Sequence, residues 1–129
     1  MATRATYTFT GEVTVHTYIH YDGYPQGAAN YFQNMLDVFG KELRGGAAEQ
    51  FIRANKLAQF TSHWDAHGDT EYHYEVDEFY NLNTFETEYV IRAYKFNGFS
   101  DDRKRHIFFE GTVAEFIKKY QGGEYGVVV

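Results

Sequence analysis

The 129-residue sequence contains no cysteine, which excludes disulfide bonds and metal sites built from thiolates. No segment approaches the roughly 20 consecutive apolar residues that a membrane-spanning helix needs. The first six residues, Met1 to Thr6, lack the apolar stretch of a secretory signal peptide. We therefore expect a cytoplasmic protein without membrane contacts.

Basic residues are in the minority. The chain has 12 lysines and arginines against 18 aspartates and glutamates, which gives a net charge of −6. Nucleic acid and anionic membranes repel an acidic chain, so neither is expected as a partner, whereas a basic protein surface would attract it. The only serines, Ser62 and Ser100, do not lie in a G-x-S-x-G turn, so the sequence does not support a serine nucleophile.

Aromatic residues, by contrast, are abundant. The chain has 12 tyrosines and 12 phenylalanines, and 43% of its residues are hydrophobic. A disordered chain lacks the apolar side chains that offset the loss of conformational entropy, so we expect this chain to fold. Its length suits one domain, residues 1–129, with its own core.

The order of hydrophobic patterns predicts the fold class. Alternation with period two predicts strands, and apolar residues at helical spacing predict helices. The segment Thr112-Val113-Ala114-Glu115 has the form of a capping box before the last helix. The predicted strands cover residues 6–10, 13–19, 59–64, 70–77, 85–96 and 105–110, and the predicted helices cover 28–43, 47–57 and the residues after 112. We therefore predict a single two-layer α+β domain in the order ββααββββα, whose mostly antiparallel sheet is covered on one face by helices.

The connection from Tyr18 to Gly27 joins a predicted strand to a predicted helix and holds the only proline. A helix start with free N–H groups favours an anion, and glycines let a ligand approach the backbone. The functional interpretation is a phosphate or nucleotide contact. The structural alternative is a turn in which an aspartate and a glycine adopt special backbone angles. The candidate ligand-binding residues are His20, Asp22, Gly23, Tyr24 and Gly27.

Three segments together resemble a known group of proteins: Tyr18–Ala29, Gly45–Asn55 and Ala66–Tyr72. The group consists of small uncharacterised proteins from phages, prophages and bacteria that carry a His-aromatic-Asp-Gly-Tyr-Pro-x-Gly motif. The resemblance covers roughly the first two-thirds of the chain. The residue before the aspartate is often tryptophan in that group and is Tyr21 here. The resemblance implies a small accessory protein of mobile elements, such as a counter-defence inhibitor, and transfers no catalytic residue.

Three histidines and four carboxylates fall at alternate positions between His63 and Glu75. On an unbroken strand they would share one face and form a site for a divalent ion such as zinc or manganese. The spacing matches no established ligand motif, and a turn at residues 66–69 would break the shared face. The alternative is a solvated hairpin. The candidate metal ligands are His63, Asp65, His67 and His73.

Five tyrosines lie in or beside the predicted strands: Tyr72, Tyr74, Tyr80, Tyr89 and Tyr94. They can stabilise the sheet as cross-strand pairs, or they can form an interface on the face that no helix covers. Both interpretations stay open from the sequence.

These patterns lead to three functional hypotheses. The first is a non-enzymatic binding protein that occludes a host protein or sequesters a small anionic ligand such as a nucleotide, without a cofactor. The second is a metal-dependent hydrolase of a phosphoester or nucleotide, with Asp22 or Glu71 as general base. The third is a homo-oligomeric structural protein built on an aromatic sheet face.

Overall fold

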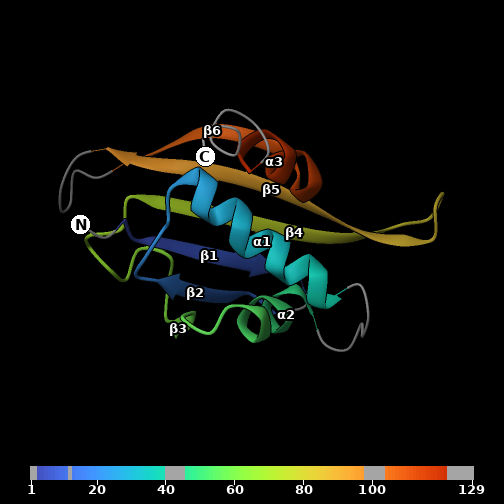
Figure 1. Cartoon of the computed structure of the whole chain (residues 1–129), viewed down its shortest axis with the longest axis horizontal. Coiled ribbons are helices and arrows are strands. Elements are labelled where there is room, and N and C mark those ends of the chain that lie inside the picture. Colours follow the sequence, from blue (N-terminus) through green and yellow to red (C-terminus); the bar gives the residue numbers. More distant parts are fainter. Residues whose placement is uncertain (1–2, 12, 40–45, 98–103, 122–129) are drawn as a thin grey trace.

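The computed structural model describes residues 3–11, 13–39, 46–97 and 104–121, and these form two layers (Figure 1). Six strands build one sheet within the described residues, and three helices lie on one of its faces. The elements are β1 (Ala5–Thr10), β2 (Val15–Ile19), α1 (Pro25–Phe39), α2 (Ala47–Ala54), β3 (Gln59–Thr61), β4 (Tyr72–Asn81), β5 (Glu86–Asn97), β6 (Lys104–Thr112) and α3 (Val113–Tyr120). The predicted α+β class and the order ββααββββα are confirmed.

The sheet has the strand order β3-β2-β1-β4-β5-β6. Four of its five pairings are antiparallel, and the central pair, β1 with β4, is parallel. A parallel pair needs a crossover connection, and here β2, the two helices α1 and α2, and β3 supply it. The first two strands of the chain, β1 and β2, therefore do not lie at an edge of the sheet. Together with β4 they form its middle.

Segments 59–64 and 70–77 were expected to form a hairpin, and that prediction is wrong. Strand β3 pairs with β2, whereas β4 pairs with β1 and β5. The connection between β3 and β4 crosses the sheet instead of turning back, and the Thr6 hydroxyl donates to the Trp64 carbonyl oxygen at 3.0 Å along the way. Long-range pairing of β4 with two neighbours outweighs the local turn signal at 66–69.

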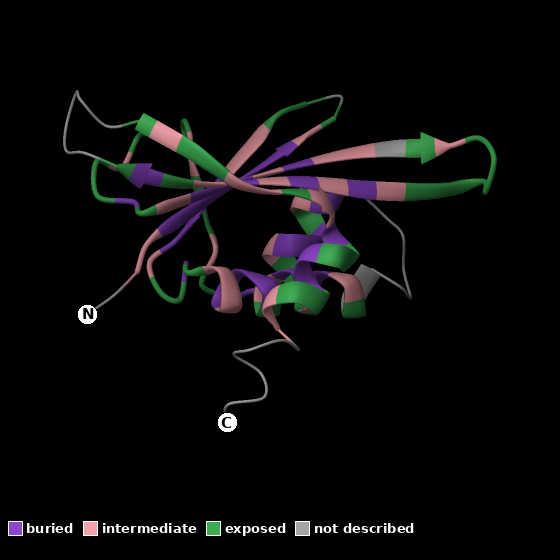
Figure 2. Cartoon of the chain, turned by 90° about the horizontal axis from the view of Figure 1, so that it is seen from above, coloured by how far each residue is buried: buried purple, intermediate pink, exposed green. Residues whose placement is uncertain are grey.

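Aromatic side chains fill the space between sheet and helices. Tyr7 of β1 stacks on Tyr74 of β4 with ring centroids 5.2 Å apart, and it meets Phe51 of α2 at 4.9 Å. Phe32 of α1 contacts Phe116 of α3 edge to face at 6.0 Å. All five of these side chains are buried, and Figure 2 shows the buried residues concentrated between the helices and the sheet. Burial of this much aromatic surface holds the two layers together.

The capping box predicted at residues 112–115 is present. The Thr112 hydroxyl accepts from the backbone N–H of Glu115 at 3.0 Å, and the Glu115 carboxylate accepts from the backbone N–H of Thr112 at 2.9 Å. Lys118 and Lys119 lie in the last turn of α3, where positive charge complements the helix dipole. The local sequence therefore sets where α3 begins.

In the described part of the chain no helix has both the length and the apolar character needed to cross a membrane. The predicted extension of the first helix beyond Phe39 to Leu43 falls outside the described residues.

We expect Thr112→Ala to lower the free energy of unfolding by about 1 kcal/mol, because it leaves an N-terminal N–H group of α3 without its acceptor. Chemical denaturation monitored by circular dichroism measures the change. Thr84→Ala is the matched control, since Thr84 is an exposed turn residue that contributes only its backbone N–H. Equal stability of the two variants would contradict the role of the cap.

Candidate functional site

The connection between β2 and α1 is tied down by its own backbone. Asp22 adopts a left-handed conformation with φ 58°, and its carboxylate accepts from the Tyr24 hydroxyl at 3.3 Å. The Gly23 N–H donates to the Thr3 carbonyl at 2.8 Å, and the buried Tyr74 hydroxyl donates to the Gly23 carbonyl at 2.6 Å. The motif therefore anchors the start of α1 to β1 and β4.

The two glycines of the motif make room for neighbouring chain. A Cβ at Gly27 would lie 2.0 Å from the Asp22 carbonyl oxygen, and a Cβ at Gly23 would lie 2.6 Å from the Ala5 Cβ. Gly27 thus faces a carbonyl oxygen at the beginning of α1, and this partial negative charge disfavours an anion. These contacts favour the structural alternative for Asp22, Gly23 and Gly27 over a phosphate cradle.

His20 joins the motif to the segment that precedes β4. Its Nδ1 accepts from the Arg4 Nε–H at 3.2 Å and lies 3.2 Å from the Tyr18 hydroxyl. Arg4 also forms an ion pair with Asp69 at 3.1 Å. The structure thus brings His20 and the 63–75 segment together, with Arg4 as the link, which the sequence alone could not establish.

The sheet face that carries no helix, here called the helix-free face, is centred on a buried histidine. His73 is fully buried, and its ring stacks between Trp64 at 4.9 Å and Tyr94 at 5.7 Å between centroids. The Arg105 guanidinium lies 4.2 Å from each of the Trp64 and Tyr94 ring centroids. It also forms an ion pair with the Glu75 carboxylate at 3.1 Å. Cation, aromatic rings and carboxylate form one packed group.

A hydrogen-bonded relay runs from this cation across three strands. Arg105 lies 2.9 Å from His73 Nδ1, and His73 Nε2 lies 2.9 Å from the Thr8 hydroxyl, which in turn lies 2.9 Å from His16 Nδ1. A guanidinium can only donate, so His73 Nδ1 must accept and the imidazole proton must sit on Nε2. His73 then donates to Thr8, whose own proton goes to His16. Arg105 therefore sets the tautomer of His16, with its proton on Nε2.

Both imidazoles of the relay are held neutral. Burial is the main cause that lowers the pKa of His73 to about 2, and Arg105, His16 and His63 lower it further. Burial also lowers the pKa of His16, as does His63, whose ring centroid lies 5.4 Å away, while Glu75 opposes these effects. Neutral imidazoles fit the donor and acceptor roles that the relay requires.

The candidate metal ligands have other partners. His63 Nδ1 accepts from the Asp65 N–H at 3.2 Å, and the His67 ring stacks on Tyr18 at 3.8 Å while its Nε2 lies 3.1 Å from the Thr61 hydroxyl. Both ring nitrogens of His73 belong to the relay. Among the described residues, no three His, Asp or Glu side chains lie together as a set that could hold a metal ion.

The tyrosines of the strands are divided between two environments. Tyr74 and Tyr89 are buried in the core, and Tyr72 packs against it. Tyr80 is 54% exposed near the end of β4, and Tyr94 contacts Arg105 and His73 on the helix-free face. The helix-free face is therefore a network of charged, polar and aromatic groups. Most of the five strand tyrosines do not lie on it.

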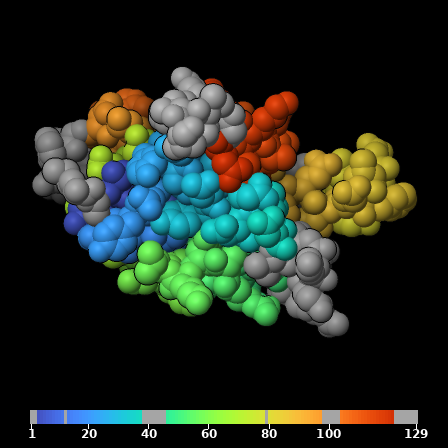
Figure 3. Space-filling model, in the orientation of Figure 1, coloured from blue at the N-terminus to red at the C-terminus, as the bar shows by residue number. Residues whose placement is uncertain are grey.

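One apolar surface was not indicated by the sequence patterns. The β4–β5 hairpin extends well beyond the body of the molecule (Figure 3). At its tip Leu82 is 76% and Phe85 74% exposed. The Asn81 side chain accepts from the N–H groups of Asn83 and Thr84 at 2.8 and 3.3 Å, and Phe85 has φ 58°. We call Tyr80, Leu82 and Phe85 the hairpin tip. Asn81 and Asn83 are turn-forming residues, but a strand starting at residue 85 was predicted because Phe85 fits the alternation.

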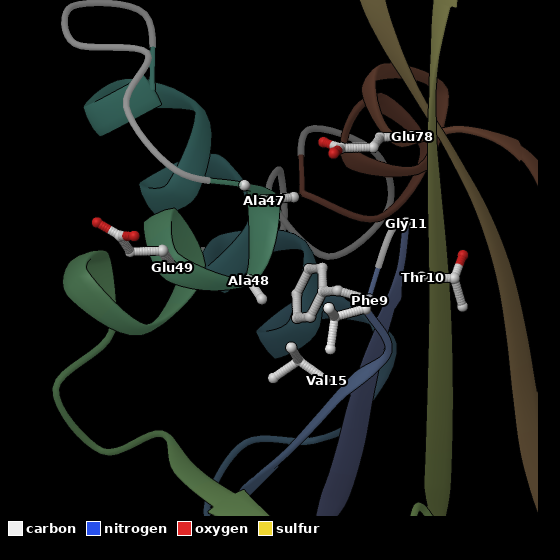
Figure 4. A pocket seen from close by; sticks show the side chains of 10 residues that line it. Phe9, Thr10, Gly11, Val15, Ala47, Ala48, Glu49 and Glu78 are labelled. Carbon is white, nitrogen blue, oxygen red and sulfur yellow. The ribbon is translucent and has the colours of Figure 1, made fainter.

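The second feature not indicated by the sequence is a pocket beside the first turn of α2 (Figure 4). It has a volume of about 580 Å³. Its walls come from the end of β1, the start of β2, the start of α2 and one residue of β4. The lining residues are Phe9, Thr10, Gly11, Val13, Val15, Gly46, Ala47, Ala48, Glu49 and Glu78.

No protein-family model, curated protein or solved structure matches the chain. The resemblance to phage and prophage proteins therefore stays a prediction that rests on the sequence motif.

We expect Gly27→Ala to destabilise the fold by about 2 kcal/mol or more, because the new methyl group overlaps a backbone carbonyl that cannot move without shifting the Asp22 turn. Thermal and urea unfolding measure the loss. Gly68→Ala is the matched control: a Cβ there meets no atom within 4 Å, so the change should stay within about 0.5 kcal/mol. A stable Gly27→Ala variant would show that the motif has room for a ligand after all.

We expect His73 to stay neutral, with its proton on Nε2, at every pH at which the protein is folded. Because its pKa is lowered from 6.5 to about 2 by folding, the unfolded chain takes up a proton that the folded chain refuses. The free energy of unfolding should therefore fall by about 2 kcal/mol from this group between pH 6.5 and 4.5. Nitrogen-15 NMR of the imidazole and unfolding at both pH values measure the two effects.

His73→Gln provides the control for this pH dependence. A glutamine amide can accept from Arg105 and donate to Thr8 but does not titrate. The variant should lose the part of the pH dependence that comes from His73. An unchanged pH dependence, or a proton on His73 Nδ1, would contradict the relay.

Proposed function

We propose that the chain acts by binding a protein partner through the hairpin tip. The observation that carries the proposal is the exposure of a leucine and a phenylalanine, 76% and 74%, at the end of a projecting hairpin. Large apolar side chains held away from the core in this way are typical of interaction sites. The proposal keeps the non-enzymatic binding hypothesis and moves its site from the His20–Gly27 connection to the hairpin.

The turn presents these side chains in a fixed conformation. The Asn81 side chain accepts two backbone N–H groups of the turn and donates to Glu88 at 2.7 Å, and the Phe85 N–H donates to the Asn81 carbonyl at 2.8 Å. A preorganised turn loses less conformational entropy on binding than a flexible loop. The tip therefore suits insertion into a pocket of the partner.

Charge defines the partner further. No lysine or arginine occurs between Lys56 and Arg92, and the parts of the arms next to the turn, residues 77–81 and 86–90, carry four carboxylates: Asp77, Glu78, Glu86 and Glu88. Opposite charges around an apolar contact speed association and exclude wrong partners. The expected partner surface is an apolar pocket rimmed by lysine and arginine. Two acidic hairpins repel each other, so this surface favours a different protein over a second copy.

The biological setting belongs to the same proposal. The resemblance of the His20–Gly27 motif implies a mobile-element accessory protein in the cytoplasm, whose partner is a host protein that the hairpin occludes. An anionic nucleotide is less well supported, because Gly27 faces the Asp22 carbonyl oxygen. A metal-dependent hydrolase is less well supported too, because His67 and His73 bond to different threonines and, among the described residues, no three candidate ligands lie together.

A photo-crosslinking amino acid at position 85, in bacterial cells that express the chain, tests the proposal. We expect a discrete adduct at position 85 and none at position 60, where Phe60 is equally exposed at 73% but lies on β3. The crosslinked protein is then purified, and its affinity for the unmodified chain is measured at low and high salt. Higher salt should weaken binding because it screens the acidic hairpin.

Two double variants provide the decisive comparison. Leu82→Ser with Phe85→Ser should weaken binding at least about tenfold, since central apolar residues each contribute more than 1 kcal/mol. Leu57→Ser with Phe60→Ser removes a leucine and a phenylalanine that are 56% and 73% exposed elsewhere, and it should leave affinity unchanged. The proposal fails if no adduct forms at position 85, or if both double variants bind alike.

A further inference from the structure

The pocket beside α2 is separate from the hairpin tip and has a distinct chemistry. Its walls are apolar: Phe9 of β1 and Val15 of β2 face Ala47 and Ala48 of α2 across the opening (Figure 4). A volume of about 580 Å³ lies within the range of small-molecule sites. None of the ten lining residues is basic, and two of them, Glu49 and Glu78, carry carboxylates.

The Glu78 carboxylate faces the pocket. Figure 4 shows its side chain extending from β4 toward Ala47, whereas the Glu49 carboxylate points away from the centre. One Glu78 oxygen lies 3.6 Å from the Cβ position of Gly11 and 3.9 Å from that of Gly46, so small residues surround it. Glu49 forms an ion pair with Arg53 at 3.5 Å, and within the described residues no ion pair involves Glu78.

Tyr89, the direct partner of Glu78 across β4 and β5, is buried next to it. Burial raises the pKa of Tyr89, and the neighbouring Glu78 raises it further. The phenol therefore stays neutral and adds no second negative charge beside the Glu78 carboxylate.

The charge of the preferred ligand follows from a comparison of two charges at the pocket, the N-terminus of α2 and the Glu78 carboxylate. The N-terminus of α2, where Gly46 provides no side-chain cap, carries about half an elementary positive charge and favours an anion. The Glu78 carboxylate carries a full negative charge and favours a cation. The carboxylate therefore outweighs the helix dipole, and an apolar wall next to it selects a ligand with an apolar body.

We propose that this pocket binds a small organic cation, an ammonium group on an aromatic or branched aliphatic body. The ammonium pairs with the Glu78 carboxylate, and the body packs against Phe9, Val15 and Ala47. This site lies apart from Leu82 and Phe85 of the hairpin tip, and of the four hairpin carboxylates named above it uses only Glu78.

Three probes that share a phenylethyl body test the proposal: 2-phenylethylamine, 2-phenylethanol and 3-phenylpropanoate. Each is titrated into the full chain to 20 mM while NMR follows the methyl groups of Val13, Val15 and Ala47. We expect the amine to shift these signals and to bind about fivefold or more tightly than the alcohol, which corresponds to the Coulomb term. The carboxylate should bind more weakly than the alcohol.

Variants locate the charge. Glu78→Gln should abolish the preference for the amine over the alcohol, and Glu110→Gln, an exposed change of the same charge on β6, should preserve it. The Leu82→Ser, Phe85→Ser double variant should bind the amine normally. A failure of the pocket proposal can therefore be distinguished from a failure of the hairpin-tip proposal. Equal binding of amine and alcohol, no shift of the three residues up to 20 mM, or an undiminished preference in Glu78→Gln would each overturn the proposal. The probe comparison decides even if Glu78→Gln does not fold.

Discussion

The fixed positive charge of Arg105 is the constraint on which the helix-free face depends. A guanidinium keeps all its protons, so it imposes one direction on every hydrogen bond that follows from it. His73 and Thr8 pass that direction on to His16 of β2, which is separated from β6 by three strands. The same guanidinium is stacked between Trp64 and Tyr94. If the cation were lost, a buried imidazole would lose its donor and the crossing segment would lose its main contact.

The two faces of the sheet are covered and stabilised in different ways. On one face, helices bury Tyr7, Tyr74 and Phe51, and apolar area provides the stabilisation. On the other face no helix is available, and a connecting segment supplies Trp64 as a partial cover. Buried polar groups there must be paired, and the relay and ion pairs do this. The candidate binding sites lie on the β4–β5 hairpin and beside α2.

Sequence patterns predicted the features that depend on residues close together in the chain, namely the helices, most strands and the capping box. Periodicity located the helices and most strands, and Thr112 with Glu115 marked the start of α3. The pairing of β1 with β4 was not predictable, because period-two alternation shows which residues share a face but not which strands lie side by side. The alternating histidines and carboxylates of segment 63–75 illustrate the limit: the chain leaves strand geometry between β3 and β4, so His63, His67 and His73 face different partners. The sequence indicated that the glycines of the β2–α1 connection give close access to the backbone. Only the structure shows that Gly27 makes room for Asp22 and that Gly23 makes room for Ala5.

The parallel pairing of β1 and β4 also determines the order in which the chain can fold. Thr10 and Asp77, which are joined by a hydrogen bond in this pair, lie 67 residues apart in sequence. Closing a loop of that length costs about 3.7 kcal/mol of chain entropy before any contact of the pair is made. A nascent chain therefore has β1 and β2 ready long before β4 leaves the ribosome, and during that interval β1 has a free edge and Tyr7 has no stacking partner. Until β4 docks, the half-made sheet exposes this edge of β1 to chaperones and to premature association.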